Sequence, residues 1–507
     1  NPDTVLDGRV RAWYQFISVL TGRIAATKPN TQQIPSRGAL AKVVKRIFIA
    51  PKGSLFLKVD FSAHELRLWA VTSKCPDLSA AFQKGLDIIS AFRKKPDPSL
   101  VKRFTIEGDI HRVNTVTFGM AKSPELVTDD IRGAVKGIAF GAVYGRSMKS
   151  LAAALKMPLE DVENIFKLFF SKLKNAAQWL LDIEKYAQSK QFVASGLNRR
   201  RNLFGLMLYR TLKENKSLRG VFNALSRRSR NSPIQGLGSD LGFSGARLIE
   251  KLVWWETRGS KRYRKNLPLL NCNMVHDSSE MEAKYAFILL AIEIIEYGLT
   301  LGNQRKAKEL HGMDFSVDLA IEMEIGPNLA MTQKWAPGFR DKTEDGSIDG
   351  KPVLKVVDGK PVQKKDKKGE LVYKDGKPVY EAEQDLCGDF NHLHAIIEWC
   401  LKTQISEHNY DIDVDAVMRK IFVPSKTPKF LLEQAKSGMF RYAERYGYDT
   451  YDMTGHQSLE ERIACGEIPF EKLIRKEQQH AIRYLGGKPD SLPGFSSYFP
   501  NLAAEPA

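Results

Sequence analysis

The sequence predicts an α+β fold in which short strands alternate with long helical segments. Residues 55–60 (LFLKVD) form a β-prone run that ends at Asp60, and residues 318–328 have the composition of another strand. Residues 110–190 are strongly helical, with apolar residues at the 3.6-residue period. Three near-copies of DGKPV predict one or two exposed hairpins at 349–353, 358–362 and 375–379.

The bulk composition favours a polyanionic partner. The chain has 507 residues, enough for more than one domain, and its 77 Lys and Arg exceed its 59 Asp and Glu, giving a formal charge of +18. Nucleic acid is the commonest partner for such a surplus. The five cysteines are odd in number and scattered, which argues against a disulfide framework and fits a reducing compartment.

The remaining segments divide by composition. Residues 76–110 are Lys-rich around PDPS and predict a helical insertion plus a loop. Ser123–Pro124 is a helix-start signal, residues 159–187 carry one long helical period, and GLNRRRN (196–202) predicts a basic turn before a helix that leads into RRSRNSPIQGLGSDL. A strand containing Asp277 is expected to lead into a helix at 284–300. Residues 386–480 are expected to be helical, and the Pro- and Gly-rich tail (491–507) loosely ordered.

No segment predicts membrane insertion. The most apolar stretch, residues 286–302, carries Glu293 and Glu296 and predicts a mostly buried helix. No signal-peptide pattern is present, and the chain begins at Asn1 rather than Met, which leads us to expect a processed, split or truncated product. We therefore expect no membrane association.

Two aspartates and one helix carry the chemistry. Asp60 and Asp277 each lie beside an apolar run, in VDFSAHELRLWA and NMVHDSSEME. Between them, RGAVKGIAFGAVYG (132–145) places four residues on one helical face at intervals of four: Arg132, Lys136, Phe140 and Tyr144. Paired carboxylates suit two Mg²⁺ ions, with Mn²⁺ as a substitute, and a cationic, aromatic helix suits a nucleoside triphosphate. The pattern indicates two-metal nucleotidyl transfer.

Several separated motifs resemble those of family A (DNA polymerase I-like) DNA polymerases, over residues 7–335. They occur in the family's order: TGR (21–23) with PNTQQIP (29–35), DFSAHELR (60–67), DIHRVNT (109–115), RGAVKGIAFGAVYG (132–145) and VHDSSEME (275–282). The resemblance implies a polymerase palm, an antiparallel sheet with flanking helices, and helical fingers. The expected divisions are palm at 1–75, fingers at 76–225 with an insertion at 76–105, palm again at 226–335, a Lys-rich hairpin linker at 336–385, and a helical extension at 386–507.

The resemblance also implies roles for single residues. Asp60, Asp277 and the backbone carbonyl of Phe61 would bind the metal ions. Arg132, Lys136 and His111 would bind the triphosphate of the incoming dNTP, with Lys136 placed to donate a proton to pyrophosphate.

The same resemblance assigns residues around the base and the sugar. Phe140 would pack on the sugar and Tyr144 would stack at the template base, while Gly141 and Gly145 would let the helix end approach the nucleotide. Glu65 matches the steric gate that excludes a ribose 2′-OH. The remaining matches would contact primer-template DNA, chiefly in the minor groove or along the backbone: Arg23, Asn30, Gln32, Arg227, Asn231, Gln235 and His276.

Three departures leave alternatives open. Ser278 follows Asp277 where the family has Glu, and this HDS form resembles single-subunit RNA polymerases, so RNA synthesis is the closest rival. The family's thumb and exonuclease lie before the matched region, so we expect either a split enzyme, in which a second polypeptide supplies them, or a fragment of a longer chain. Residues 336–507 extend beyond the family pattern. There, Cys387, His392, His394 and Cys400 are zinc-ligand types at a spacing that matches no common site, so an ordinary helix is the other interpretation.

The expected function is template-directed DNA synthesis in viral replication. The insertion, the extension and the apparent splitting suggest a bacteriophage gene, by analogy alone, and hence action in the cytoplasm of a bacterial host. An inactive DNA-binding scaffold is the alternative of a different class. Two paired carboxylates that repel each other without metal argue against it.

Overall fold

The structure is a computed structural model that describes residues 8–15, 18–35, 38–208, 214–257, 267–364, 370–374 and 377–422. All of these lie in one compact unit, Asn1–Phe440. The helices predicted beyond residue 422 and the tail at 491–507 lie outside the described residues.

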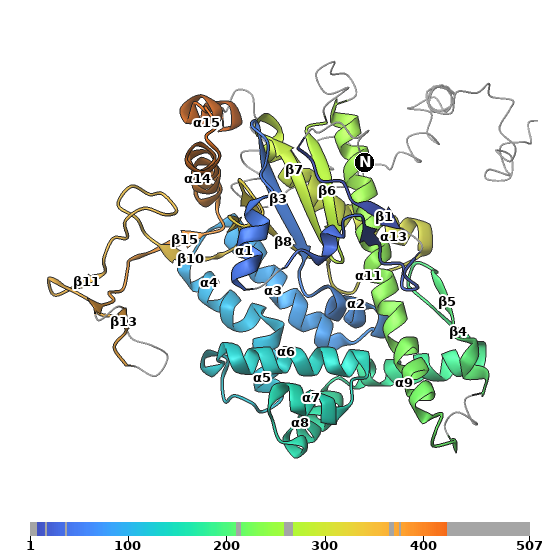
Figure 1. Ribbon diagram of the computed structural model, residues 1–507. Helices are drawn as coiled ribbons and strands as arrows, with labels where there is room; N and C mark the ends of the chain where they lie inside the picture. The colour runs from blue at the N-terminus through green and yellow to red at the C-terminus, as the bar shows by residue number, and fades with distance from the viewer. Residues whose placement is uncertain are drawn as a thin grey trace, which may run out of the picture. The chain divides into compact units, whose positions relative to one another are not determined.

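A five-stranded antiparallel sheet organises this unit (Figure 1). The strands run in the order β6-β7-β3-β8-β9, so the first of them in sequence, β3, lies at the centre. Their bounds are β3 Ser54–Phe61, β6 Leu269–Val275, β7 Ser278–Lys284, β8 Ile321–Gly326 and β9 Gln333–Lys334. The sheet and its flanking helices confirm the predicted α+β class.

The two faces of the sheet differ because side chains alternate along β3. Leu55, Leu57 and Val59 are at most 1% exposed and point into the core, where burial of each stabilises the fold by about 1.5–3 kcal/mol. Lys58 and Asp60 lie on the opposite face. On the core side, helix α11 (Arg219–Thr257) packs against both α2 (His64–Ser73) and α12 (Ile288–Leu299), and α12 also packs on β7.

Helices fill residues 76–190, as predicted. They are α3 Pro76–Lys94, α4 Pro98–Arg103, a π-helical turn Phe104–Gly108, α5 Ile110–Thr117, α6 Asp129–Tyr144, α7 Met148–Leu155, α8 Leu159–Lys172 and α9 Lys174–Lys190. The insertion is two helices joined at PDPS, where the Asp97 side chain accepts from Ser99 N and caps α4.

Two predictions about this region were wrong in detail. Ser123–Pro124 begins a single 3₁₀ turn, Pro124–Leu126, and its serine makes no side-chain cap; the long helix α6 begins five residues later. The long period at 159–187 is two helices, because Leu173 leaves the helical conformation between α8 and α9 (φ −102°, ψ 54°). Both helices bury apolar faces, so periodicity alone does not reveal the break.

The helix α11 is the longest element, with 39 residues, and it contains Pro233. It contacts α2, α6, α9, α12 and α13 (Leu301–His311), so it links the sheet side of the unit to the helical side (Figure 1). The boundary placed between fingers and palm at 225/226 falls inside this helix. Before it, a hairpin of β4 (Phe192–Ala194) and β5 (Arg200–Asn202) contains the predicted basic turn.

The N-terminal part forms a short hairpin and two small helices. Its elements are β1 Trp13–Gln15, β2 Ala25–Thr27, a 3₁₀ turn Thr31–Gln33 and α1 Ala39–Arg46. Two further 3₁₀ turns are Phe204–Leu208 and Tyr285–Phe287.

The apolar helical stretch Tyr285–His311 has the length and composition to cross a membrane, but 72% of its most apolar window is buried inside the protein. Glu293 within it is fully buried. The stretch therefore packs as a core element, as predicted for residues 286–302.

Past the sheet, the chain forms strands and then helices. The elements are β10 Gly338–Asp341, β11 Val356–Val357, β12 Lys360–Pro361, β13 Tyr373–Lys374, β14 Lys377–Pro378, β15 Gln384–Cys387, α14 Phe390–His408 and α15 Val414–Phe422. β11–β12 and β13–β14 are the predicted exposed hairpins, and β10 pairs with β15 at their base. The helix α14 packs on β8 of the main sheet.

Candidate active site

The sheet register brings Asp60 and Asp277 together. Asp60 is the penultimate residue of β3, as predicted. Asp277 was expected to lie in a strand, and this prediction was wrong. It lies in the two-residue turn between β6 and β7, because β6 ends at Val275 and β7 begins at Ser278. The Phe61 N–H donates to the Asp277 carbonyl over 3.2 Å, which holds the turn against the end of β3.

The charges around Asp60 are mostly negative. Burial by the surrounding protein, followed by the charge of Asp277 and then of Glu322, raises the pKa of Asp60 from 3.8 to about 6, against a smaller opposing effect of Lys58. Two adjacent carboxylates with unbalanced charge form a site that a divalent cation would stabilise.

The donor set fits Mg²⁺ better than a softer metal, because carboxylate and carbonyl oxygens are its preferred ligands. The Phe61 N–H faces Asp277, and in a strand the carbonyl of the same residue faces the same neighbour. Within the described residues, no three Cys, His, Asp or Glu side chains are close enough to hold a metal ion. Asp60, Asp277 and this carbonyl are oxygen donors that lie at the same end of the sheet.

Ser278 and Glu322 flank Asp60 on its two neighbouring strands. Asp60 pairs with Ser278 of β7 and with Glu322 of β8, so all three side chains lie on one face. The Ser278 hydroxyl donates to Val275 O at 3.0 Å, and Glu322 forms an ion pair with Lys334 at 2.6 Å. Sequence reasoning missed Glu322, because only the strand register places it beside Asp60.

Arg132, Lys136 and His111 form a second group, on α6 and α5. Arg132 Nε donates to Asp109 Oδ2 at 2.5 Å, and Asp109 also caps α5 by accepting from His111 N. Burial, followed by the charges of Arg132 and Lys136, lowers the pKa of His111 to about 4, with Asp109 opposing. No role was predicted for Asp109. It accepts a hydrogen bond from the guanidinium of Arg132, which was expected to bind phosphate.

The rest of α6 fits the prediction in part. The Phe140 side chain lies outside what the structure describes, and Tyr144 is half-buried at the end of the helix. Gly141 faces Leu151 of α7, where an added Cβ would come within 3.2 Å, so its small size lets α6 and α7 pack closely. Gly145 has φ +62°, a conformation that ends α6, and a Cβ added there would lie 3.0 Å from the Arg227 side chain. The missing side chain therefore lets α11 pack close to the end of α6.

Arg23, which was expected to contact DNA, is paired with Glu65, which was expected to exclude a ribose 2′-OH. Its Nη2 bonds Glu65 Oε1 at 3.0 Å, in the first turn of α2, and Ala63 reaches φ +49° where the chain turns from β3 into that helix. Burial, then the charge of Asp277, raises the pKa of Glu65 to about 7, although Arg23 lowers it. His276, beside Asp277 in the turn, has φ +55° and a pKa lowered by burial and by Arg23.

The other expected DNA contacts fall into two classes. Gln32 braces the protein itself, because its side-chain oxygen accepts from Ala26 N and its side-chain nitrogen donates to Met274 O. Asn30 caps the following 3₁₀ turn and is exposed. Arg227, Asn231 and Gln235 recur every fourth residue along one side of α11.

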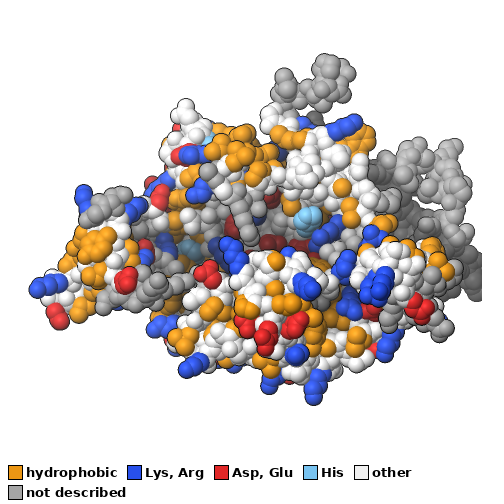
Figure 2. Space-filling model, turned by 60° about the horizontal axis from the view of Figure 1, so that its bottom comes forward, with side chains coloured by type: hydrophobic (Ala, Val, Ile, Leu, Met, Phe, Trp, Pro, Cys, Tyr) orange, Lys and Arg blue, Asp and Glu red, His pale blue; other side chains and the backbone are white. Residues whose placement is uncertain are grey.

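Figure 2 shows a hollowed region whose floor is acidic and whose rim carries Lys, Arg and a His side chain. An acidic centre bounded by cations is the pattern that a metal site with a polyanionic substrate requires. Asp60, Asp277, Glu65, Arg23 and His276 are joined by bonds or charge effects, and the group around Arg132 forms separately on α6.

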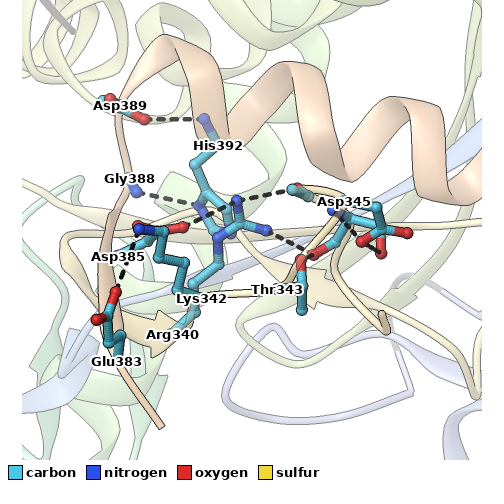
Figure 3. A network of polar contacts seen from close by, with 11 residues as sticks. Arg340, Lys342, Thr343, Asp345, Glu383, Asp385, Gly388, Asp389 and His392 are labelled. Carbon is cyan, nitrogen blue, oxygen red and sulfur yellow. Dashed lines mark hydrogen bonds and ion pairs between the residues drawn. The ribbon is translucent and has the colours of Figure 1, made fainter. Parts of the chain in front are cut away.

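The Cys/His set near α14 does not converge on a metal. His392 Nδ1 accepts from Gly388 N at 3.0 Å, and its ring lies beside Arg340, as Figure 3 shows. Burial raises the pKa of the Cys387 thiol to about 11, and burial of Cys400, which is complete, raises the pKa of its thiol well above the ordinary value. These contacts favour the interpretation of a helix with ordinary structural residues.

Comparison with known proteins agrees with this geometry. The model of DNA polymerase family A matches residues 2–96 and 93–330. DNA polymerase I of Lactococcus lactis subsp. lactis is 29% identical over 331 residues, which cover 65% of this chain and 32% of that protein. DNA polymerase I of Caldicellulosiruptor bescii is 26% identical over 321 residues, covering 63% and 32%. The chain thus spans about a third of the length of these curated relatives.

A solved structure shows the same fold. The POL domain of Pol1 from M. smegmatis, in complex with DNA primer-template and dNTP, aligns with a TM-score of 0.52 and 21% identity, covering 65% of this chain and 49% of that one. Because the family model covers more than half of the sequence, this chain belongs to DNA polymerase family A.

Proposed function

We propose that this chain performs template-directed DNA synthesis, adding deoxynucleotides from dNTPs to a primer 3′-OH. The observation that carries the proposal is the juxtaposition of Asp60 and Asp277 at one end of the sheet, where the negative charge of Asp277 helps to raise the pKa of Asp60. A fold relative solved with primer-template DNA and dNTP supports the choice of substrates.

Asp60, Asp277 and the Phe61 carbonyl would hold the metal ions. Bound Mg²⁺, or Mn²⁺ in its place, would activate the 3′-OH and neutralise charge on the phosphates. A carboxyl group with a pKa near 6 is mostly ionised at pH 7 and above, so Asp60 is available as a ligand there.

The α6 group would hold the triphosphate. Arg132 would exchange its bond to Asp109 for phosphate oxygens, and His111, neutral at pH 7 because its pKa is about 4, would donate a hydrogen bond without adding charge. The primer 3′-OH would lose its proton to solvent, and its oxygen would form a bond to the α-phosphorus as the bond from that phosphorus to the bridging oxygen breaks. Lys136 Nζ would give a proton to the departing pyrophosphate.

Selection would rest on Glu65 and on minor-groove contacts. Glu65 is 8% exposed, so its side chain is confined as a steric gate requires. Arg23, His276 and the α11 residues would contact the primer-terminal region. Phe140 and Tyr144 would contact the sugar and the template base.

One observation favours a second function, RNA synthesis. Ser278, with its hydroxyl bonded to Val275 O, stands where the family has a carboxylate. Against it stand Glu65 and the TGR and PNTQQIP motifs.

The test is primer extension with Mg²⁺ on a defined template. It compares dNTPs with rNTPs for the wild type, Asp60→Ala and Asp277→Ala. We expect dNTP-dependent extension that both substitutions abolish. Extension that survives Asp60→Ala would overturn the site, and preferential use of rNTPs would select the second function. Three expectations stay predictions: a bacteriophage origin, action in a bacterial cytoplasm, and a partner polypeptide that supplies the thumb and the exonuclease.

A further inference from the structure

The ion pair between Arg23 and Glu65 joins two parts of the proposed site. Arg23 follows the turn closed by the bond from Gly22 N to Val19 O, and Glu65 lies in the first turn of α2. The contact between Arg23 Nη2 and Glu65 Oε1 is 3.0 Å, with the side chains 25% and 10% exposed. Removing one partner of such a pair leaves the other charge without compensation in a poorly hydrated place.

The surroundings make the position of Arg23 consequential for Glu65. Burial and the negative charge of Asp277 both favour the neutral form of this carboxyl group, and Arg23 opposes them by a hydrogen bond and by its charge. Arg23 also acts electrostatically on His276 in the β6–β7 turn. A shift of the guanidinium would therefore alter both the charge and the placement of Glu65.

A guanidinium can serve two partners at once. It has five N–H donors in a rigid plane, so one edge can hold a carboxylate while other N–H groups meet acceptors elsewhere. A correctly formed base pair presents minor-groove acceptors at fixed positions, whereas a mispair displaces them.

We propose that Arg23 is a positioning residue for Glu65, and that their ion pair couples the fit of the primer-terminal base pair to the choice between deoxyribose and ribose. The inference rests on the proposed function, because it assigns Glu65 to the nucleotide sugar and Arg23 to the primer terminus. A mispaired terminus would draw Arg23 away from Glu65 and relax sugar selection.

The experiment measures nucleotide binding without catalysis, using the full chain. Primer-template ending in a dideoxynucleotide is titrated with the matching dNTP or rNTP. The readout is the dissociation constant of the rNTP divided by that of the dNTP, which is large when ribose is excluded. We expect Arg23→Gln to lower this ratio by about tenfold, which corresponds to about 1.4 kcal/mol. Arg23→Lys, which keeps the charge, should retain part of the selectivity.

A double-mutant cycle isolates the coupling. Glu65→Gln keeps the size of the gate but loses its charge, so Arg23→Gln should have no further effect on the ratio in that background. A mismatched primer terminus should lower the ratio in the wild type and leave it unchanged in Arg23→Gln. Arg227→Gln is the matched control, because it removes another cation expected to bind DNA and should weaken both nucleotides equally.

The outcomes separate the inference from the proposed function. If Arg23→Gln and Arg23→Lys weaken dNTP and rNTP by the same factor, Arg23 only binds DNA and the inference fails alone. If Glu65→Ala leaves the ratio unchanged, the gate assignment fails and the inference with it. If the wild type binds neither nucleotide on primer-template, the proposed function itself is overturned. Circular dichroism of each variant establishes that it is folded.

Discussion

The end of the main sheet and the base of the C-terminal extension both gather charged residues and histidines, yet they differ in how those charges are balanced. At Asp60, the charges of Asp277, Glu322 and Glu324 raise the pKa of the carboxyl group, and the charge of Lys58 lowers it. At Arg340, the guanidinium donates to Ser347 O and Gly346 O, each at 3.3 Å, and lies 3.9 Å from Asp385, while His392 accepts from Gly388 N (Figure 3).

The difference teaches how to separate a site from structural polarity. In the extension, Arg340 and His392 are bonded to backbone groups of the extension itself, and burial raises the pKa of the Cys387 and Cys400 thiols, which favours structural roles for these residues over zinc binding. The end of the sheet keeps like charges together, which costs stability unless a ligand neutralises them. Unbalanced charge, rather than residue type, indicates function here.

The largest expected effect is on the rate of nucleotide incorporation, and it should follow from removing a carboxylate at the end of the main sheet but not from removing one in the extension. Asp277→Asn should reduce the rate of single-nucleotide incorporation by about 1000-fold, or about 4 kcal/mol, because a ligand of the proposed metal site is lost. Asp385→Asn, in the extension, should leave the rate within about twofold. Rapid-quench measurement on primer-template checks both, and equal losses in the two variants would remove the distinction.

The second effect is on stability and should appear in the extension. Arg340→Gln should destabilise the protein by about 2 kcal/mol, because two backbone carbonyls and Asp385 lose their donor or counter-charge. Urea denaturation measures it. Lys342→Gln is the control, since Lys342 is 47% exposed and pairs with an exposed Glu383, so its loss should stay below about 1 kcal/mol. Identical midpoints for the two variants would contradict the structural role of Arg340.

The third effect has the opposite sign. Because the folded-state pKa of Asp60 is about 6 rather than 3.8, its ionised form destabilises the folded protein above pH 6, and the penalty fades as the pH falls toward 4. Asp60→Asn should therefore stabilise the metal-free protein at pH 8 by on the order of 1 kcal/mol, after allowance for solvent screening.

Melting curves at pH 8 and pH 4.5 check the sign of this effect. The gain should fall to about a third of its pH 8 value at pH 4.5 and vanish only below the ordinary pKa of 3.8. It should also shrink at pH 8 when Mg²⁺ is added, because the ion would neutralise Asp60 in the wild type. A variant that is less stable than the wild type at pH 8 would show that Asp60 makes a favourable contact in the folded state.

The smallest expected effect is none. Prolonged treatment with EDTA or a zinc chelator should leave the melting temperature unchanged, because His392 is committed to Gly388 N and burial keeps the Cys387 and Cys400 thiols protonated. Elemental analysis of the purified protein is the independent check. Stoichiometric zinc, lost together with stability on chelation, would make the extension a metal site after all.

Local patterns were sufficient for much of this molecule. The apolar run before Asp60 predicted β3, the helical period predicted α8 and α9, and DGKPV predicted the hairpins, because each depends on neighbours close in the chain. The break at Leu173 and the turn position of Asp277 were not predicted, since the same residues fit a continuous helix or strand equally well. Glu322 was missed because its relation to Asp60 depends on the register between β3 and β8.

The sequence by itself determined the family, the α+β class and the identity of the paired aspartates, because these depend on residue types in a fixed order. Only the tertiary structure decided which charges meet. It placed Glu322 and Ser278 on either side of Asp60, tied Arg132 to Asp109, paired Arg23 with Glu65, and directed Gly141 toward α7. Electrostatic energy depends on distance and solvent exposure, and neither is written in the order of the residues.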